Sequence, residues 1–196
     1  MSDGTATTAN ALPKWLPLAT RHYLHHIAWG QSIRHIARVD ANAASTVLRQ
    51  VRRIEARRDD PLLDEALSTL TKFLEYPLHK AAAASGEASA NSPSPEETPM
   101  DATLLRPALA DEKTINKEGR RILRRLCETG ALLVLANDME KAVVLRPGPA
   151  GEQTRTAVVD RSIAGAFVLK EWIKADAVGR LSKYSITQTG RSALKR

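Results

Sequence analysis

The sequence predicts a mainly α-helical chain with a small α+β part near its C-terminus. Apolar residues recur at helical spacing through the first 74 residues, and two strand-like runs follow residue 130. Between them, residues 81–101 contain few large apolar side chains. With 196 residues, of which 43% are hydrophobic, the chain can build one medium core or two small ones. We expect two, separated by a linker.

The predicted organisation has four segments. Residues 1–13 are small and polar, and we expect them to be disordered. Residues 14–80 should form a helical domain, 81–112 a flexible linker rich in Ala, Ser and Pro, and 113–196 a basic C-terminal domain. Four acids and no base stand at 81–101, which suits a solvated linker.

Four short helices are expected in the N-terminal domain. They span 15–29, 33–39, 44–60 and 62–74. Gly30 should end the first helix and Ser32 should cap the second, because a serine side chain can accept a hydrogen bond from a free backbone N–H. Residues 40–42 then make a turn. Pro61 and Pro77 should stop the third and fourth helices, since proline disrupts a helix interior.

The C-terminal domain mixes helices with strands. The expected elements are a helix over 114–129, strands over 131–136 and 141–147, a loop over 148–154, a helix over 160–174, a strand over 182–187 and a closing helix over 189–196. The helix over 160–174 is apolar nearly all round, so it should be buried. This content is typical of a winged-helix-like domain, although the order of the elements is not the standard one.

The third helix gathers arginine on one face. Five arginines fall within ten positions: Arg49, Arg52, Arg53, Arg57 and Arg58. With about 100° of rotation per residue, the apolar residues form a separate core stripe of Val47, Leu48, Val51 and Ile54. The polar residues Ser45 and Thr46 share the arginine face, and Gln50 lies beside it. A helix that is basic by chance would scatter these side chains more widely.

Two helices joined by a tight turn are typical of a helix-turn-helix, whose second helix enters the major groove of double-stranded DNA. The early residues of that helix reach base edges, and here they are Ser45, Thr46, Arg49 and Gln50. The residues assigned to phosphates are Arg52, Arg53, Arg57 and Arg58. On the preceding helix, Arg34, His35 and Arg38 lie where the first helix crosses the backbone.

The charge of the chain favours an anionic partner. The formal net charge is +7 and the isoelectric point is about 9.8. Residues 21–58 hold eight arginines against two acids, and residues 113–196 hold seventeen bases against eight acids. A second basic face over the helix at 114–129 comprises Lys117, Arg120, Arg121, Arg124 and Arg125. This face is either a solvated side of an amphipathic helix or a contact for DNA or an acidic protein.

The stretch ASTVLRQVRRIEARRDDPL resembles the helix-turn-helix of a family of alphaproteobacterial regulators that includes the activators of gene transfer agent production. SIRHIARV fits that pattern, and KYSITQTGRSALKR resembles the end of the accompanying domain. The resemblance covers 16–70 and 116–196. It implies a promoter-binding transcription activator of phage-derived genes that contacts RNA polymerase. Ala41 and Asn42 replace the family's usual glycine and small apolar residue. Asparagine tolerates left-handed backbone better than alanine, so the turn should shift by one residue.

The sequence gives little support for an enzymatic or a metal-binding function. The sequence has no GxxxxGK or GxGxxG loop and no recognisable catalytic set, so we expect neither an enzyme nor a cofactor. His22, His25 and His26 have helical spacing that can hold a metal, but they lack a cysteine or well-placed carboxylate partner. We therefore expect no metal site. Cys127 is the only cysteine, which excludes an intramolecular disulfide and suits a reducing cytoplasm.

The expected location is the cytoplasm, at the nucleoid, because neither a secretory signal nor an apolar run of ~18 residues is present. One alternative function is an adaptor whose basic faces bind acidic proteins. Another is a structured-RNA binder, which the 4% aromatic content disfavours. A homodimer is also possible, since helix-turn-helix proteins often read two half-sites, and the apolar segment 167–173 is a candidate interface.

Overall fold

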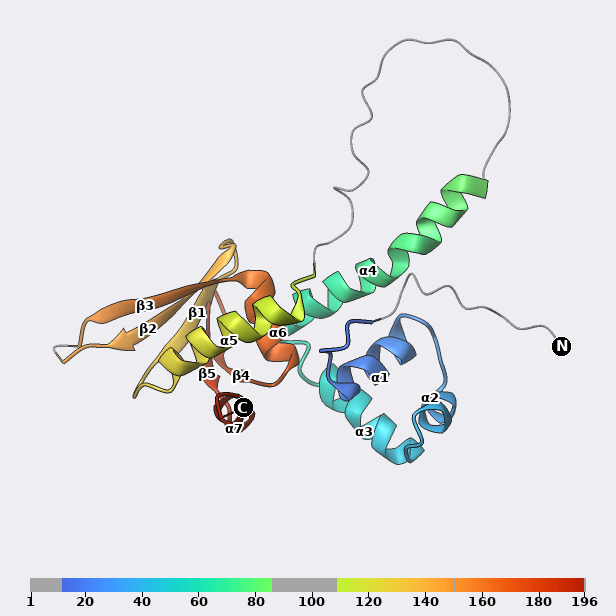
Figure 1. The fold of residues 1–196 in the computed structure, drawn as a ribbon, viewed down its shortest axis with the longest axis horizontal. Coiled ribbons are helices and arrows are strands. Elements are labelled where there is room, and N and C mark those ends of the chain that lie inside the picture. The colour runs from blue at the N-terminus through green and yellow to red at the C-terminus, as the bar shows by residue number, and fades with distance from the viewer. Residues whose placement is uncertain (1–11, 86–108, 150, 196) are drawn as a thin grey trace, which may run out of the picture.

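The computed structural model describes residues 12–85, 109–149 and 151–195. The predicted disordered N-terminus, apart from residues 12 and 13, and residues 86–108 of the predicted linker lie outside the described residues. The described chain contains seven helices and a five-stranded antiparallel sheet, so the expected mixture of α and α+β structure is confirmed. In Figure 1, α1 to α4 lie on one side of the molecule, and the sheet with α5, α6 and α7 lies on the other.

Three short helices open the fold. They are α1 (Leu18–Ile27), α2 (Ile33–Val39) and α3 (Ala44–Glu55). The Ser32 side chain accepts a hydrogen bond from the backbone N–H of His35 at 3.2 Å, which confirms the predicted cap of α2. Val47, Val51 and Ile54 are buried as predicted. Leu48 does not belong to this core stripe, because it lies toward the edge of the contact with α1 and α2 and remains 37% exposed.

The turn between α2 and α3 places Ala41 in the left-handed backbone region, with φ of 50°. The Asn42 side chain donates a hydrogen bond to the backbone oxygen of Asp40 at 3.0 Å. The predicted shift of the turn by one residue is therefore wrong. Ala41 itself occupies the position that glycine would take, at a cost of roughly 1 kcal/mol, and contacts of the flanking helices hold it there.

Asp60 connects α3 to α4 (Pro61–Ser85). Its carboxylate accepts a hydrogen bond from the backbone N–H of Leu62 at 3.1 Å, so it satisfies one of the free donors at the start of α4. Pro61 takes the first position of that helix, where its missing N–H costs nothing. It begins α4 rather than stopping α3, which ends earlier, at Glu55. The expected stop before Pro77 is also wrong, because the alanine-rich segment that follows has high helix propensity and α4 runs on to Ser85.

One sheet forms the centre of the C-terminal part. Its strands are β1 (Leu132–Ala136), β2 (Lys141–Pro147), β3 (Gln153–Asp160), β4 (Ile173–Ala177) and β5 (Leu181–Ile186). They lie in the order β3-β2-β1-β5-β4, and all neighbours are antiparallel. The hairpin of β1 and β2 and the strand β5 match their predictions. The sequence did not predict β3 and β4.

Pairing across the sheet explains both missed strands. Most of β3 follows the predicted loop at 148–154, and it forms because it pairs with β2. The helix predicted over 160–174 from its apolar residues includes only the first two residues of β4, Ile173 and Lys174, and no element is predicted for the rest of this strand. Glu171 has a φ of 56°, which breaks the chain direction after α6 (Arg161–Leu169) and lets β4 pair with β5. Strand formation here is decided by tertiary contacts.

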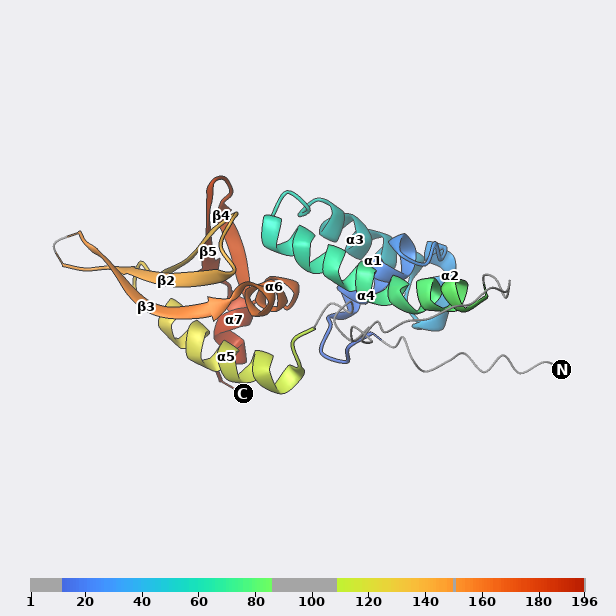
Figure 2. The same cartoon turned by 90° about the horizontal axis from the view of Figure 1, so that it is seen from above.

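The helices cover one face of the sheet, and α6 joins the two halves of the molecule (Figure 2). α5 (Glu112–Leu126) and α6 both pack on the sheet, while α7 (Gln188–Ala193) packs against α5. α6 also packs on α4, and a Cβ at Gly165 would lie 3.2 Å from the Ala66 Cβ. Residues 163–169 are all buried. Ile173 is buried as well, whereas Trp172 is half-buried, so most apolar side chains of the candidate dimer interface at 167–173 are covered within the chain and the interface stays a prediction.

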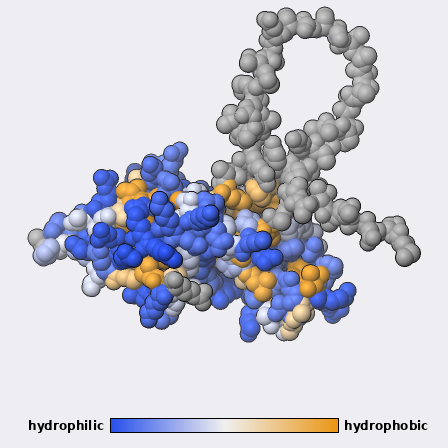
Figure 3. Space-filling view, viewed as in Figure 1, coloured by the Kyte–Doolittle hydropathy of each residue, from blue (hydrophilic) through white to orange (hydrophobic). Residues whose placement is uncertain are grey.

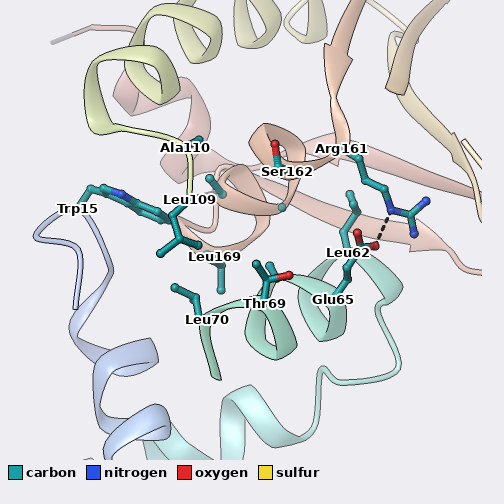
Figure 4. Close-up of a pocket in the computed structure, with 13 residues that line it drawn as sticks. Trp15, Leu62, Glu65, Thr69, Leu70, Leu109, Ala110, Arg161, Ser162 and Leu169 are labelled. Atoms are coloured by element: carbon teal, nitrogen blue, oxygen red, sulfur yellow. Dashed lines mark hydrogen bonds and ion pairs between the residues drawn. The ribbon is translucent and has the colours of Figure 1, made fainter. Parts of the chain in front are cut away.

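Two apolar surfaces remain partly open. A hollow of about 70 Å³ lies between α4 and α6, where Leu70, Leu169 and Trp15 approach one another (Figure 4). An ion pair between Arg161 and Glu65 closes its edge. On the face of the sheet away from the helices, half-buried apolar side chains form a continuous strip: Leu132, Val134, Val143, Leu145 and Val158.

Candidate nucleic-acid interface

The exposed side of α3 carries four of the nine predicted DNA-binding residues, namely Ser45, Arg49, Arg52 and Arg53. Ser45, Arg49 and Arg52 are exposed, whereas Thr46 is half-buried. α2 precedes α3 across the tight turn and presents Arg34 and Arg38, which are also exposed. Neither Arg49 nor Arg52 forms an ion pair within the described part of the chain, and the same is true of Arg34. These guanidinium groups can therefore donate hydrogen bonds to a phosphate or a base edge without losing an internal partner.

Gln50 differs from its neighbours, because its side chain is engaged inside the fold. The ring of His22 in α1 is fully buried, and its two nitrogens form hydrogen bonds with Gln50 at 2.6 Å and with Asp40 at 2.7 Å. The three side chains connect α1, the end of α2 and α3. Base reading by Gln50 would require this buried chain to break, which leaves a polar group without a partner.

Arg53 and Arg57 both reach the C-terminal part. Their guanidinium groups donate hydrogen bonds to the two carboxylate oxygens of Glu171, at 3.0 Å and 3.4 Å respectively. The side chain of Arg53 is 64% exposed, and that of Arg57 is 27% exposed. Glu171 thus neutralises part of the predicted phosphate-binding end of α3. Sequence reasoning missed this residue, because it lies far from α3 in the chain and no local pattern marks it.

Arg58 serves the fold. Its guanidinium binds the Asp64 carboxylate and donates a hydrogen bond to the Tyr23 hydroxyl at 3.2 Å. These hydrogen bonds, with Asp64 making the larger contribution, raise the pKa of Arg58. Burial raises the pKa of the Tyr23 hydroxyl, although the neighbouring Arg58 opposes this effect. Arg58 therefore ties α1 to α4 through two side chains.

The second predicted basic face also contains both paired and unpaired cations. Arg121 pairs with Glu118 and donates to the backbone oxygen of Val158, while Arg125 pairs with Glu128. The remaining members of the face are exposed and form no ion pair within the described segments: Lys117, Arg120 and Arg124. Figure 3 shows a mainly hydrophilic surface over α5.

The histidines of α1 use their ring nitrogens within the fold. His25 bonds with the Gln31 side chain at 3.2 Å, and the His26 ring donates to the Gln31 backbone oxygen at 2.8 Å. Burial lowers the pKa of His25, and its hydrogen bond to Gln31 partly offsets this. Among the described residues, no group of three or more His, Cys, Asp or Glu side chains could hold a metal ion. No described helix is both long and apolar enough to span a bilayer.

The chain has no match among models of protein families, curated proteins or solved structures. The geometry of α2 and α3 and the charges around them therefore carry the functional argument.

Proposed function

We propose that the protein is a sequence-specific DNA-binding transcription regulator in which α2 and α3 act as a helix-turn-helix. The observation that carries this proposal is the exposed face of α3, where Arg49 and Arg52 stand beside Ser45 without an internal ion pair. A guanidinium can bind guanine through two parallel hydrogen bonds, and an early position on the second helix suits that contact. If these arginines served to stabilise the fold, they would form ion pairs with acidic side chains of the chain.

The roles along the helix follow from which side chains are free. We assign base edges to Ser45, Thr46 and Arg49, and phosphate contacts to Arg52 and to Arg34 of α2. Gln50 is better suited to orienting α3 against α1 through His22. Arg53 and Arg57 can join the phosphate contacts only by exchanging Glu171 for the DNA backbone.

We further propose that the C-terminal part acts as a winged-helix-like module that supports activation. The β4–β5 hairpin carries exposed Arg180 and Lys183, whose charges suit a phosphate contact. The strip of half-buried apolar side chains on the open sheet face suits a protein partner such as RNA polymerase or another transcription factor. The resemblance of α2 and α3 to gene transfer agent activators points to phage-derived target genes at the nucleoid.

Titration of promoter and random duplexes at several salt concentrations tests the proposal. Arg49→Ala should lose ~1 to 3 kcal/mol on promoter DNA and less on random DNA, because it removes a base contact. Arg52→Ala should weaken both duplexes alike and lower the salt slope by about one. Arg155→Ala removes an exposed arginine from β3 and serves as the control. A wild-type protein that binds both duplexes equally would contradict the proposal and favour the adaptor alternative.

A further inference from the structure

A cavity of about 450 Å³ lies between the segment before α1, the first half of α5, the end of α6 and α7. Its volume falls within the usual range for small-molecule sites, roughly 300 to 1,000 Å³. Two indole rings, two cationic groups and two hydroxyls contribute to its wall: Trp15, Trp172, Lys170, Arg120, Thr189 and Ser192. The wall therefore mixes polar and apolar surface, which suits a ligand with both a charged group and an apolar body.

Lys170 is the unusual member of the wall. Its ammonium lies 4.7 Å from the centre of the Trp172 ring and 5.9 Å from that of Trp15. No carboxylate within the described residues forms an ion pair with it, and partial burial lowers its pKa, with the charge of Glu112 acting in the opposite direction. The Lys170 ammonium is partly shielded from water and has no anionic partner in the described chain. Binding an external anion would therefore be favourable.

The fold holds the Trp172 wall in place. A Cβ at Gly119 would lie 2.6 Å from the Trp172 ring, so glycine is needed for the ring to rest against α5. Its backbone is held as well, since the backbone N–H of Thr187 donates to the Trp172 carbonyl oxygen at 2.9 Å. A Cβ at Gly190 would lie 2.2 Å from that same carbonyl oxygen. The pocket is therefore formed before any ligand arrives.

We propose that this cavity binds a small organic anion, with its carboxylate or phosphate at Lys170 and Arg120 and its flat apolar body against the indole rings. Arg120 lies on α5, exposed and without an ion pair in the described chain, so it can complete the anion contact. Thr189, Ser192 and Asn116 supply neutral hydrogen bonds. A bound anion touches Trp15 and Pro17, which lead directly into α1. The proposal does not depend on DNA binding.

The full chain can be titrated with 8-anilinonaphthalene-1-sulfonate, a fluorescent anion on a flat aromatic body, in the absence of DNA. We expect saturable binding to one site and displacement by adenosine monophosphate. Lys170→Gln should weaken binding by about tenfold or more, because it removes a charge-assisted contact. Arg120→Gln should weaken binding by a smaller factor, and Lys170→Arg should retain most of it. Displacement by inorganic phosphate as well would show that the anion contact dominates.

Arg124→Gln provides the matched control, since it removes the same charge from the same helix outside the cavity. It should bind the probe like the wild type. Thermal unfolding of each variant, followed by circular dichroism, verifies that the fold is intact. Absence of saturable binding, or equal affinities for the folded wild type, Lys170→Gln and Arg120→Gln, would overturn the proposal. Neither result would bear on the duplex titrations.

Discussion

The Tyr184 hydroxyl donates a hydrogen bond to the Asp60 carboxylate at 2.8 Å, and this contact joins β5 to the start of α4. Tyr184 is fully buried and Asp60 is 7% exposed. The same oxygen of Asp60 accepts the backbone N–H of Leu62. One buried carboxylate thus caps a helix of the N-terminal part and binds a strand of the C-terminal part, so the two halves share a polar contact inside a common core.

Removing the hydroxyl should destabilise the whole chain. Tyr184→Phe leaves the Asp60 carboxylate buried with one fewer donor, and we expect a loss of about 2 kcal/mol in the free energy of unfolding. Urea denaturation measures this change. Tyr23→Phe is the control, because its hydroxyl also bonds to a charged side chain but in a less buried contact, and it should lose less. Equal losses of unfolding free energy in the two variants would contradict the prediction that the Asp60 contact contributes more to stability.

The same contact predicts how stability depends on alkaline pH. Burial raises the pKa of the Tyr184 hydroxyl above its ordinary value of 10.0, and the negative charge of Asp60 adds to the effect. The folded chain therefore favours the protonated hydroxyl. This contribution is fully present below pH 10.0 and is lost as pH rises toward the raised folded pKa. Above pH 10.0, unfolding free energies of Tyr184→Phe should fall less steeply than those of the wild type. Parallel curves would be inconsistent with this assignment.

Glu171 should restrain DNA binding. Glu171→Gln removes the charge that holds Arg53 and Arg57, and both arginines then become available to phosphates. We expect tighter binding to promoter and random duplexes alike, with a salt slope steeper by up to about two. Stability should change by less than about 1 kcal/mol, because these pairs are partly solvent-screened. Glu65→Gln, which breaks the ion pair with Arg161 away from both basic faces, should leave DNA affinity unchanged. If Glu171→Gln bound DNA with unaltered affinity, Arg53 and Arg57 would not be part of the DNA interface.

Gln50 and Arg49 are neighbours on α3, and we expect their substitution by alanine to have different effects: the first should reduce stability and the second should reduce DNA binding. Gln50→Ala leaves a ring nitrogen of the buried His22 without its partner, so we expect a loss of roughly 1 to 3 kcal/mol in unfolding free energy. Arg49→Ala alters an exposed side chain, and its stability should stay within about 0.5 kcal/mol of the wild type. Denaturation and duplex titration on the same samples distinguish the two effects. If Gln50→Ala kept full stability but lost promoter preference, Gln50 would be a base-reading residue after all.

Local patterns predicted α2, most of the core stripe of α3, the hairpin of β1 and β2, and β5. Each of these has a strong periodicity or a capping residue within its own segment, as Ser32 shows. They failed at Ala41, where the flanking helices impose a left-handed backbone on an unfavourable residue. They also failed at β4, whose helix-favouring residues become a strand by pairing with β5.

The sequence by itself determined which helix is basic, because the spacing of arginine and apolar residues along 44–60 separates two faces. Only the tertiary structure decided which of those arginines are free. Glu171 reaches Arg53 and Arg57, and Asp64 reaches Arg58, whereas Arg49 and Arg52 meet no acid in the described chain. The physical reason is that charge composition is local to a helix, while the pairing of its charges depends on acids that folding brings from elsewhere in the chain.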